Sequence, residues 1–228
     1  MDPIPLATRL RFIQHPEQCS FYNMAVDEAL LRLINEKEKP ILRVYGWSDP
    51  AVSIGYFQKM DDVPEGRPFV RRFTGGGLVD HTNDYTYSII VPQQHPIYQM
   101  GTSKSYAKIH ESISHALVDL GLSAALAEEC STGDSNACFE KPVRYDVMQG
   151  ESKLAGAAQR RNRLGCLHQG SILVPNLDHG KMNPALLRHL LPLLAQDWEE
   201  SSLDSQERTK AEKLTQQRYS TYIWNHQR

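Results

Sequence analysis

The sequence predicts an α+β fold built around a mixed β-sheet, and three observations support this. Segments with helical periodicity alternate irregularly with short β-like runs. The runs in the middle of the chain lie at the spacing of hairpins, which favours antiparallel pairing. The length of 228 residues, 40% of them hydrophobic, suits one large domain with a sizeable core. The pattern differs from the regular strand–helix alternation of a doubly wound parallel sheet.

The first helix is predicted over residues 23–36, with Asn23 as its N-cap. Its apolar side chains recur at the helical period, as at Val26, Leu30 and Leu33. Short runs rich in β-branched and aromatic residues follow, separated by turn residues. These predicted strands cover residues 41–47, 51–57, 69–72 and 85–91.

A second helix is predicted between Ser103, its expected N-cap, and Gly121, which ends it. One apolar stripe runs along it, formed by Tyr106, Ile109, Ile113, Leu117 and Leu120. Residues 128–142 are too polar for a core strand and are predicted to form a surface loop. Strands are predicted to resume at residues 145–149, 152–161 and 166–174.

The last part of the chain is predicted to be helical. A leucine-rich helix is expected to open at Asn183-Pro184 and to stop at Pro192. Asp204 and Glu207 have the spacing of a capping box, which predicts a final helix. We therefore expect a single domain over residues 1–228, with a short helical C-terminal extension over residues 176–228.

Composition argues against several classes of protein. The formal net charge of −2 argues against a general nucleic-acid-binding protein. No apolar run is long enough for a transmembrane helix, and the first residues lack the apolar stretch of a signal peptide. The four cysteines show no metal-ligand spacing. We therefore expect reduced thiols, no metal site and a cytoplasmic location.

The segment RRFTGGGLVDH, residues 71–81, places three glycines between arginines and a histidine. Glycine loses much conformational entropy on folding, so such a run indicates a turn or a close approach to the main chain. The N–H groups of Gly75–Gly77 could bind a phosphate, carboxylate or acyl carbonyl oxygen, with Arg72 adding charge-assisted hydrogen bonds. The pattern is neither the dinucleotide-binding GxGxxG motif nor a Walker P-loop. A plain hairpin turn with surface arginines is the alternative interpretation.

The segment KLAGAAQRR begins at Lys153 and continues with small residues, including Gly156 and Ala157. A strand of small residues leaves room beside it. A lysine at the border of that room could place its ammonium on a carbonyl or phosphate oxygen. The alternative is a tightly packed strand with a solvated lysine.

Cys138 lies in the predicted polar loop, although unpaired cysteine is normally buried. A thiol there could act as a nucleophile if a nearby cation lowered its pKa. It could also be an incidental loop cysteine, the interpretation we favour for Cys130. His168 lies in a predicted strand and fits either a site residue or a hydrogen-bonded core histidine.

Taken together, these segments resemble the lipoate and octanoate attachment family. This family comprises lipoate–protein ligases and octanoyltransferases and is related to biotin–protein ligases. The matching segments, in the family's order, are NMAVDEALL (23–31), WSDPAVSIGYFQ (47–58), RRFTGGGLVDH (71–81), YDVMQGESKLAGAAQRR (145–161) and HQGSIL (168–173). The combination of RR-x-TGGG-x-V-x-H with K-x-AG-x-AQ is the most specific part of the resemblance.

The resemblance implies a mixed sheet flanked by helices, an architecture shared with class II aminoacyl-tRNA synthetases. It implies that the glycine-rich turn is part of the wall of a tunnel for a medium-chain acyl group or its adenylate. It also implies that Lys153 contacts the activated acyl carbonyl. The residues that the resemblance assigns to the acyl pocket are Arg72, Gly75, Gly76, Gly77, His81, Gly156, Ala157 and His168.

Among these enzymes, the chain resembles the cysteine-dependent octanoyltransferases most closely. Ligases tend to have a His-Asp-x-Gly-Asn run after the glycine turn and a further C-terminal domain. This chain instead reads DHTNDYT, and only a short segment follows residue 175. Octanoyltransferases have their nucleophile in a segment like ACFEKP, shortly before the lysine strand. The resemblance therefore assigns the nucleophile to Cys138 and a catalytic role to Lys153.

The implied reaction begins with octanoyl-acyl carrier protein and proceeds through a thioester on Cys138. A lysine of a lipoyl domain, in 2-oxoacid dehydrogenases or the glycine cleavage H protein, then takes the octanoyl or lipoyl group, and no cofactor is needed. Lys153 would favour the thiolate, and N–H groups near Gly156 and Ala157 would hold the oxyanion. Because carrier proteins are acidic, a basic rim should guide docking. The candidates for this rim are Arg160, Arg161 and Arg163.

Other functions fit the same residues. An ATP-dependent lipoate–protein ligase would use ATP and Mg, form an acyl-adenylate near Lys153 and leave Cys138 incidental. An amidotransferase would move the acyl group between two lipoyl domains. A non-catalytic relative would keep the acyl pocket without turnover.

Overall fold

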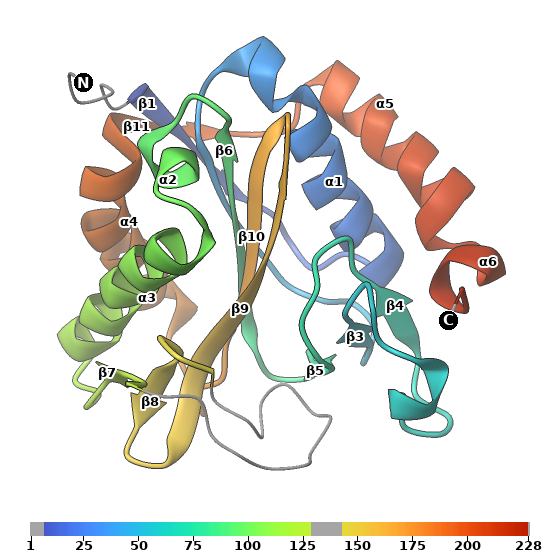
Figure 1. The fold of residues 1–228 in the computed structure, drawn as a ribbon, viewed down its shortest axis with the longest axis horizontal. Helices are drawn as coiled ribbons and strands as arrows, with labels where there is room; N and C mark the ends of the chain where they lie inside the picture. The colour runs from blue at the N-terminus through green and yellow to red at the C-terminus, as the bar shows by residue number, and fades with distance from the viewer. Residues whose placement is uncertain (1–6, 129–142, 228) are drawn as a thin grey trace.

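The computed structural model describes residues 7–128 and 143–227, which form a large mixed β-sheet with helices on both faces (Figure 1). The sheet order is β11-β1-β2-β6-β10-β9-β8-β7. β1 is parallel to both β2 and β11, and the other neighbouring strands are antiparallel. The strands are β1 Ala7–Gln14, β2 Ile41–Tyr45, β6 Tyr85–Pro92, β7 Ala125–Leu126, β8 Val147–Gln149, β9 Ser152–Asn162, β10 Gly165–Ile172 and β11 Ala195–Ser201. The predicted α+β fold with a mixed sheet flanked by helices is confirmed.

Two helical layers cover this sheet (Figure 1). The short helix α2 (Pro96–Gln99), α3 (Thr102–Asp119) and α4 (His179–Leu194) pack on one face. α1 (Ser20–Lys37) and α5 (Ser205–Leu214) pack on the other. Strand side chains alternate between faces, so Ile41 joins the core under α1 while its neighbour Leu42 joins the core under α4.

A second, three-stranded sheet lies beside α1, in the order β4-β3-β5. Its strands are β3 (Val52–Ile54), β4 (Phe69–Arg71) and β5 (Val79–Asp80), with the short 3₁₀ helix η1 (Met60–Asp62) between β3 and β4. The glycine-rich turn connects β4 to β5. This placement brings the small sheet opposite β9 and β10, and a cavity forms between them.

The start of α1 differs from the sequence prediction. The helix begins at Ser20, and Asn23 is not its N-cap. The Ser20 main-chain N–H donates to Asp49 Oδ1 (2.9 Å), and the Ser20 hydroxyl donates to Asp49 Oδ2 (2.7 Å). The buried Asn23 amide instead donates to the carbonyl of Gly46 (2.9 Å). The prediction failed because the capping carboxylate lies 29 positions along the chain.

Other helix boundaries also differ. α3 begins at Thr102, with Gly101 rather than Ser103 as its N-cap. α4 begins at His179, because the Asp178 side chain accepts hydrogen bonds from the next turn. It continues through both prolines that were expected to bound it.

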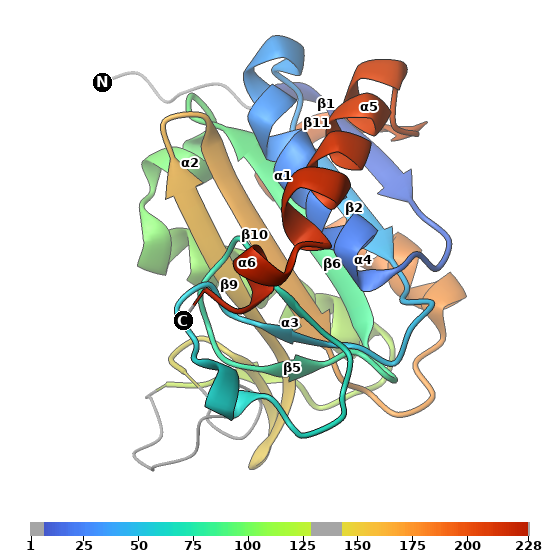
Figure 2. The ribbon, with the colours of Figure 1, turned by 90° about the vertical axis from the view of Figure 1, so that its right-hand side faces the viewer.

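The C-terminal part contributes more than helices. β11 pairs in parallel with β1 and extends the large sheet, which the sequence did not predict. The capping box of Asp204 and Glu207 at the start of α5 is confirmed. α5 lies alongside α1 in Figure 2 and continues into the π-helical turn η2 (Thr215–Tyr219), which also packs on α1. The last helix, α6 (Tyr222–Asn225), packs on β4. Within residues 7–128 and 143–227, no helix has both the length and the apolar character needed to span a bilayer.

A buried ion pair joins β1 to α5. Arg11 Nη1 donates to Glu207 Oε1 (2.5 Å), and Arg11 Nη2 donates to Glu207 Oε2 (3.0 Å). The same carboxylate accepts the Asp204 main-chain N–H (2.9 Å) and completes the capping box. Both members of the pair are buried. One side chain therefore fixes the helix start and its position on the sheet.

We predict that Glu207→Ala lowers the free energy of unfolding by about 3–5 kcal/mol, because Arg11 would stay buried without its carboxylate partner. Glu212→Ala changes an exposed residue of the same helix and should alter this free energy by less than about 0.5 kcal/mol. Urea denaturation followed by circular dichroism measures both. Equal effects of the two substitutions would contradict the role of the ion pair.

Candidate active site

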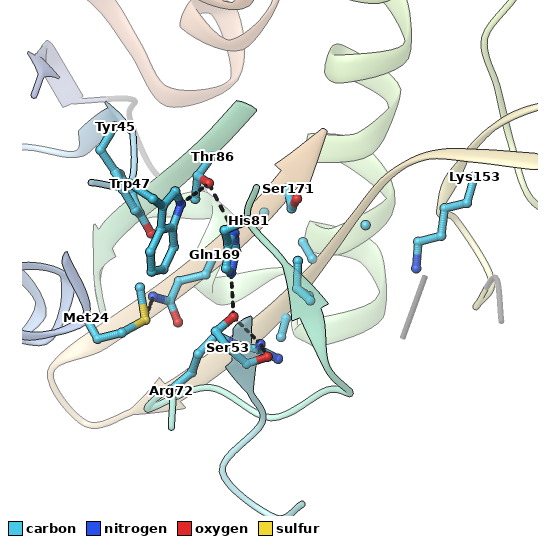
Figure 3. Close-up of a pocket in the computed structure, with 15 residues that line it drawn as sticks. Met24, Tyr45, Trp47, Ser53, Arg72, His81, Thr86, Lys153, Gln169 and Ser171 are labelled. Carbon is cyan, nitrogen blue, oxygen red and sulfur yellow. Dashed lines mark hydrogen bonds between the residues drawn. The ribbon is translucent and has the colours of Figure 1, made fainter. Parts of the chain in front are cut away.

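A cavity lies between the large sheet and the three-stranded sheet (Figure 3). It contains about 440 Å³ of space, including the part open to solvent. The residues that line it are Met24, Tyr45, Trp47, Ser53, Arg72, Val79, His81, Thr86, Lys153, Gly156, Ala157, Ala158, Gln169, Gly170 and Ser171. The small residues of β9 border this space, as the sequence pattern predicted. Their side chains are too small to fill it.

Lys153 lies at one end of the cavity, whereas Met24, Tyr45 and Trp47 lie at the other (Figure 3). The Lys153 ammonium pairs with Asp146, with 2.8 Å between Nζ and Oδ2, and the two side chains are 4% and 0% exposed. A Cβ on Gly156 would lie 2.4 Å from Lys153 Cε and 2.6 Å from Nζ. The lysine therefore occupies the space that the missing side chain of Gly156 leaves.

Asp146 is held from several directions. The Tyr106 hydroxyl donates to Asp146 Oδ1 (2.5 Å), and the Val143 N–H donates to Asp146 Oδ2 (2.8 Å). Burial and the Asp146 charge raise the pKa of Tyr106 well above its ordinary value. The hydroxyl therefore stays protonated and donates a hydrogen bond to the carboxylate. These contacts fix the carboxylate that positions Lys153.

The Ala157 N–H, which lies among the predicted oxyanion donors near Gly156 and Ala157, has a hydrogen-bond partner in this structure. The Ala157 N–H donates to the Tyr106 hydroxyl oxygen (3.1 Å). Because this N–H already has a partner, it could stabilise an oxyanion only after that hydrogen bond breaks. The Lys153 ammonium is the polar donor that the structure places at this end of the cavity.

The glycine-rich turn is organised around Arg72. Arg72 Nη2 donates to the carbonyls of Gly75 (3.0 Å) and Gly77 (2.8 Å). Arg72 Nη1 donates to the carbonyl (2.8 Å) and hydroxyl (2.7 Å) of Ser53. Gly76 has a φ of 84°, a conformation that favours glycine. Thus Arg72 lines the cavity, whereas Gly75, Gly76 and Gly77, which were predicted to line it, are not among the lining residues. Gly75 and Gly77 instead bind Arg72 through their carbonyls.

A hydrogen-bonded chain continues from Ser53 through His81 to Asp84. Ser53 Oγ lies 2.6 Å from His81 Nε2, and His81 Nδ1 lies 2.8 Å from Asp84 Oδ2. Because the Asp84 carboxylate can only accept, His81 Nδ1 carries the hydrogen and donates it to this hydrogen bond. In the neutral ring Nε2 is then an acceptor, and the Ser53 hydroxyl donates to it. The His81 ring stacks on Trp47 with 3.9 Å between ring centres. This chain fixes one wall of the cavity.

Asp27 anchors the floor of the cavity. Arg43 Nη1 (2.7 Å) and the Ser88 hydroxyl (2.8 Å) donate to Asp27 Oδ1. The Tyr45 hydroxyl (3.0 Å) and Gln169 Nε2 (2.8 Å) donate to Oδ2.

The Gln169 side chain carries this network to the glycine-rich turn. Gln169 Oε1 accepts the hydroxyl hydrogen of Thr74 (2.7 Å). The buried carboxylate of Asp27 thus links its own helix α1 to strands β2, β6 and β10 and, through Gln169, to the glycine-rich turn.

Comparison with known proteins agrees with this architecture. Residues 20–201 match the Lipoyl protein ligase A/B catalytic domain. The chain belongs to this family. Octanoyltransferase LipM of Brevibacillus brevis is 38% identical over 180 residues, and the match covers 72% of this chain and 65% of that protein. Octanoyltransferase LipM of Bacillus subtilis is 36% identical over 188 residues, covering 75% of this chain and 67% of that protein. The chain therefore spans about two thirds of the length of these relatives.

A solved structure of a lipoate-protein ligase has a similar fold. The crystal structure of lipoate-protein ligase A bound with ATP has a TM-score of 0.79 and 26% identity to this chain, and the match covers 97% of this chain and 99% of that one. Its similarity extends beyond the strands that carry the sequence motifs and includes the C-terminal part of the fold.

Of the site residues predicted for this lipoyl protein ligase A/B chain, five line the cavity together. They are Arg72, His81, Lys153, Gly156 and Ala157. Cys138, predicted as the nucleophile, lies outside the described residues, as does Cys130.

His168 points to the opposite face of β10 and does not line the cavity. Its Nε2 lies 3.2 Å from the Tyr87 hydroxyl and its Nδ1 lies 3.1 Å from Gln159 Nε2. Burial lowers the pKa of His168 well below its ordinary value. This corresponds to the core-histidine interpretation of the sequence, because alternate residues of β10, Gln169 and Ser171, face the cavity instead.

The three arginines predicted to form a basic rim do not form one patch. Arg160 lies over the rings of Phe73 (4.5 Å) and Tyr56 (5.2 Å). Its neighbour Arg161 lies over Tyr98 (4.7 Å) on the α3 side of the sheet. Consecutive residues of a strand point to opposite faces, so the two charges are separated by the sheet. Arg163 is exposed in the turn between β9 and β10.

Sequence reasoning missed Asp27, Ser53, Asp84, Asp146 and Gln169. The spacing of Asn23 and Asp27 was a usable signal, since two polar residues four positions apart lie on one face of an otherwise apolar helix. Ser53 had no comparable signal, because it acts through Arg72 and His81, which are distant in the sequence. Asp84 lies close to its partner His81 in the sequence, so the pair was a second usable signal.

His110 packs behind the Tyr106 contact and gives a pH prediction. Its Nδ1–H donates to the carbonyl of Tyr145 (2.7 Å), and burial lowers the pKa of His110 to about 4. In the unfolded chain this histidine has its ordinary pKa of 6.5 and takes up a proton there, whereas the folded protein does so only near pH 4. The unfolded state is therefore favoured as the pH falls from 6.5 towards 4.

We therefore predict that the free energy of unfolding falls over this range, by up to about 1.4 kcal/mol per pH unit from this histidine. His110→Gln should make the decline shallower. His115→Gln, exposed on the same helix, should not. Urea denaturation at several pH values measures the slopes, and an unchanged slope in His110→Gln would refute the assignment.

Proposed function

We propose that this protein transfers an octanoyl or lipoyl group onto a lysine of a lipoyl domain, in a 2-oxoacid dehydrogenase or the glycine cleavage H protein. The observation that carries the proposal is the buried Lys153 ammonium at one end of a cavity whose other end is apolar and aromatic. The names of the relatives support the acyl group, since both are octanoyltransferases. The expected cytoplasmic location belongs to the same proposal.

The cavity suits a hydrocarbon chain with one polar end. Met24, Tyr45 and Trp47 would contact the chain, and each methylene removed from water contributes about 0.8 kcal/mol. The acyl carbonyl would lie next to Lys153. Its ammonium would then donate to the carbonyl oxygen as negative charge develops there.

In the proposed reaction, the Cys138 thiolate attacks the thioester carbonyl of octanoyl-acyl carrier protein. The carbonyl carbon forms a bond to the Cys138 sulfur, and the carrier leaves as its thiolate, which takes up a proton. The lipoyl-domain amine then attacks the new thioester, forms an amide and releases the Cys138 thiol. Exchange of one thioester for another is nearly balanced, so this route needs no cofactor. The role of Cys138 rests on the family resemblance.

An ATP-dependent ligase reaction is the second candidate. It is favoured by one observation, the 26% identical lipoate-protein ligase A whose structure contains ATP. In that reaction, ATP and Mg would activate free octanoate or lipoate, and Cys138 would not be acylated.

Intact-mass spectrometry distinguishes the two reactions. After mixing with octanoyl-acyl carrier protein, we expect a mass gain of one octanoyl group on the protein, absent in Cys138→Ser and present in Cys130→Ser. A lipoyl domain added next should gain the octanoyl group. If the domain is modified only when octanoate and ATP are supplied, and Cys138→Ser is as active as the unaltered protein, the ligase reaction holds and the thioester route is excluded.

The packing of Lys153 on Gly156 gives a prediction about rate. Gly156→Ala would place a methyl group within 2.6 Å of the ammonium nitrogen and displace it. A displacement of about 1 Å can lower a reaction rate about 100-fold, so we expect a fall in kcat of that order. Gly75→Ala adds the same methyl where, among the described residues beyond its chain neighbours, only Phe57 lies within 4 Å, and should cost much less. Steady-state transfer assays compare the two, and similar kcat values for both variants would contradict the proposed position of Lys153.

A further inference from the structure

Arg71, the last residue of β4, is fully buried and directly precedes the cavity residue Arg72. Its guanidinium donates to main-chain carbonyls on two sides. Nη1 donates to the carbonyls of Gly55 (3.1 Å) and Gln58 (2.7 Å). Nη2 and Nε both donate to the carbonyl of Asn225, at 2.9 Å and 3.2 Å. One arginine therefore joins the segment after β3 to α6.

The α6 segment also binds the main chain of Arg71. The Arg71 N–H donates to Asn225 Oδ1 (2.8 Å), and Trp224 Nε1 donates to the Arg71 carbonyl (2.9 Å). β4 is an edge strand of the small sheet, so these two side chains occupy the main-chain groups that a further strand would otherwise pair. Asn225 Nδ2 donates to the carbonyls of Tyr219 (2.7 Å) and Thr221 (3.0 Å), which fixes its orientation.

The segment held by Arg71 packs directly on the glycine-rich turn. The Tyr56 N–H donates to the Thr74 carbonyl (2.8 Å). A Cβ on Gly55 would lie 1.9 Å from the Gly76 carbonyl oxygen, so the two backbones are in direct contact. The Arg72 N–H donates to the Ile54 carbonyl (2.8 Å). The position of the turn, and of Arg72 within it, therefore depends on residues 54–58.

We propose that Asn225 is a positioning residue for the acyl cavity. Through Arg71, it fixes β4, from which Arg72 enters the cavity, and residues 55–58, on which the glycine-rich turn packs. Binding sites require support of this kind because the residues that contact a ligand must be held in place by others. The inference rests on the proposed function, in which the cavity takes the acyl chain.

Asn225→Ala tests this inference. It removes the acceptor for the Arg71 N–H and the two amide hydrogen bonds, so the wall formed by the turn should loosen while Lys153, on β9, is unaffected. We expect the KM for octanoyl-acyl carrier protein to rise about tenfold, with little change in kcat, since a tenfold change corresponds to loss of about one hydrogen bond. The preference for octanoyl over hexanoyl and decanoyl donors should also weaken.

Two further variants make the test specific. Trp224→Phe removes the Nε1 hydrogen bond to Arg71 and shortens the ring, keeps the Asn225 contacts, and should shift KM in the same direction by a smaller factor. Ile223→Ala changes a side chain that is 82% exposed on the same helix and should leave KM and chain preference unchanged. Thermal denaturation shows whether each variant is folded.

The outcomes separate this inference from the proposed function. Unchanged KM and chain preference in folded Asn225→Ala and Trp224→Phe would overturn the inference, as would a loss confined to kcat. If Asn225→Ala does not fold, Trp224→Phe decides the result alone. If the unaltered protein transfers no acyl group, the proposed function fails. Calorimetric titration with octanoic acid then compares the same variants, and equal affinities, or no binding at all, would overturn the inference.

Discussion

The buried carboxylate of Asp27 is the constraint on which the rest of the site depends. A carboxylate removed from water is strongly unfavourable unless it is paired and fully hydrogen-bonded. Its four donors come from β2, β6 and β10, and one of them, Gln169, also binds Thr74 at the start of the glycine-rich turn. A shift of any of these elements by one residue would turn a donor to the other face of the sheet and leave the charge unsatisfied. The network therefore fixes the register of the strands that bound the cavity.

The two ends of the cavity are held by separate sets of contacts. Asp146 and Tyr106 fix Lys153 from the α3 side of the sheet, whereas Arg72, Ser53 and His81 fix the wall formed by the small sheet. The small residues Gly156, Ala157 and Ala158 of β9 line the cavity between them. Because the hydrogen bonds named above for the two sets involve different side chains, a change in one should alter the lysine and a change in the other should alter the wall. Under the proposed function, this separation would allow the transfer rate and the acyl-chain preference to be altered independently.

The sequence predicted those parts of the molecule whose signals are local. The alternation and spacing of apolar residues gave the mixed α+β fold, and the capping box predicted α5. The motif around Lys153 and the triple glycine indicated the residues that meet at the cavity. Features that depend on distant partners were missed or wrong: Asp49 caps α1, and β11 pairs with β1. The pairing of Asp146 with Lys153 was missed although the two residues are close in the sequence, because it depends on how β8 and β9 pair. The resemblance assigned His168 to the acyl pocket, while the residues alone also allowed a core histidine. The structure agrees with the core histidine, because alternate residues of a strand point to opposite faces and Gln169 and Ser171 face the cavity.

The Asp146 partner also changes how Lys153 is understood. An unpaired ammonium would favour a nearby thiolate through its full charge. Here a carboxylate lies 2.8 Å from the nitrogen, so the pair presents a much weaker field to a thiol at a distance. A hydrogen bond from the ammonium to an acyl carbonyl oxygen acts at short range and depends on where the donor lies. The neighbouring carboxylate therefore weakens this hydrogen bond much less than it weakens the field at a distant thiol. The geometry therefore favours a lysine that acts on the carbonyl oxygen during attack over one that prepares the nucleophile beforehand, and Asp146 and Gly156 supply the position that this role requires.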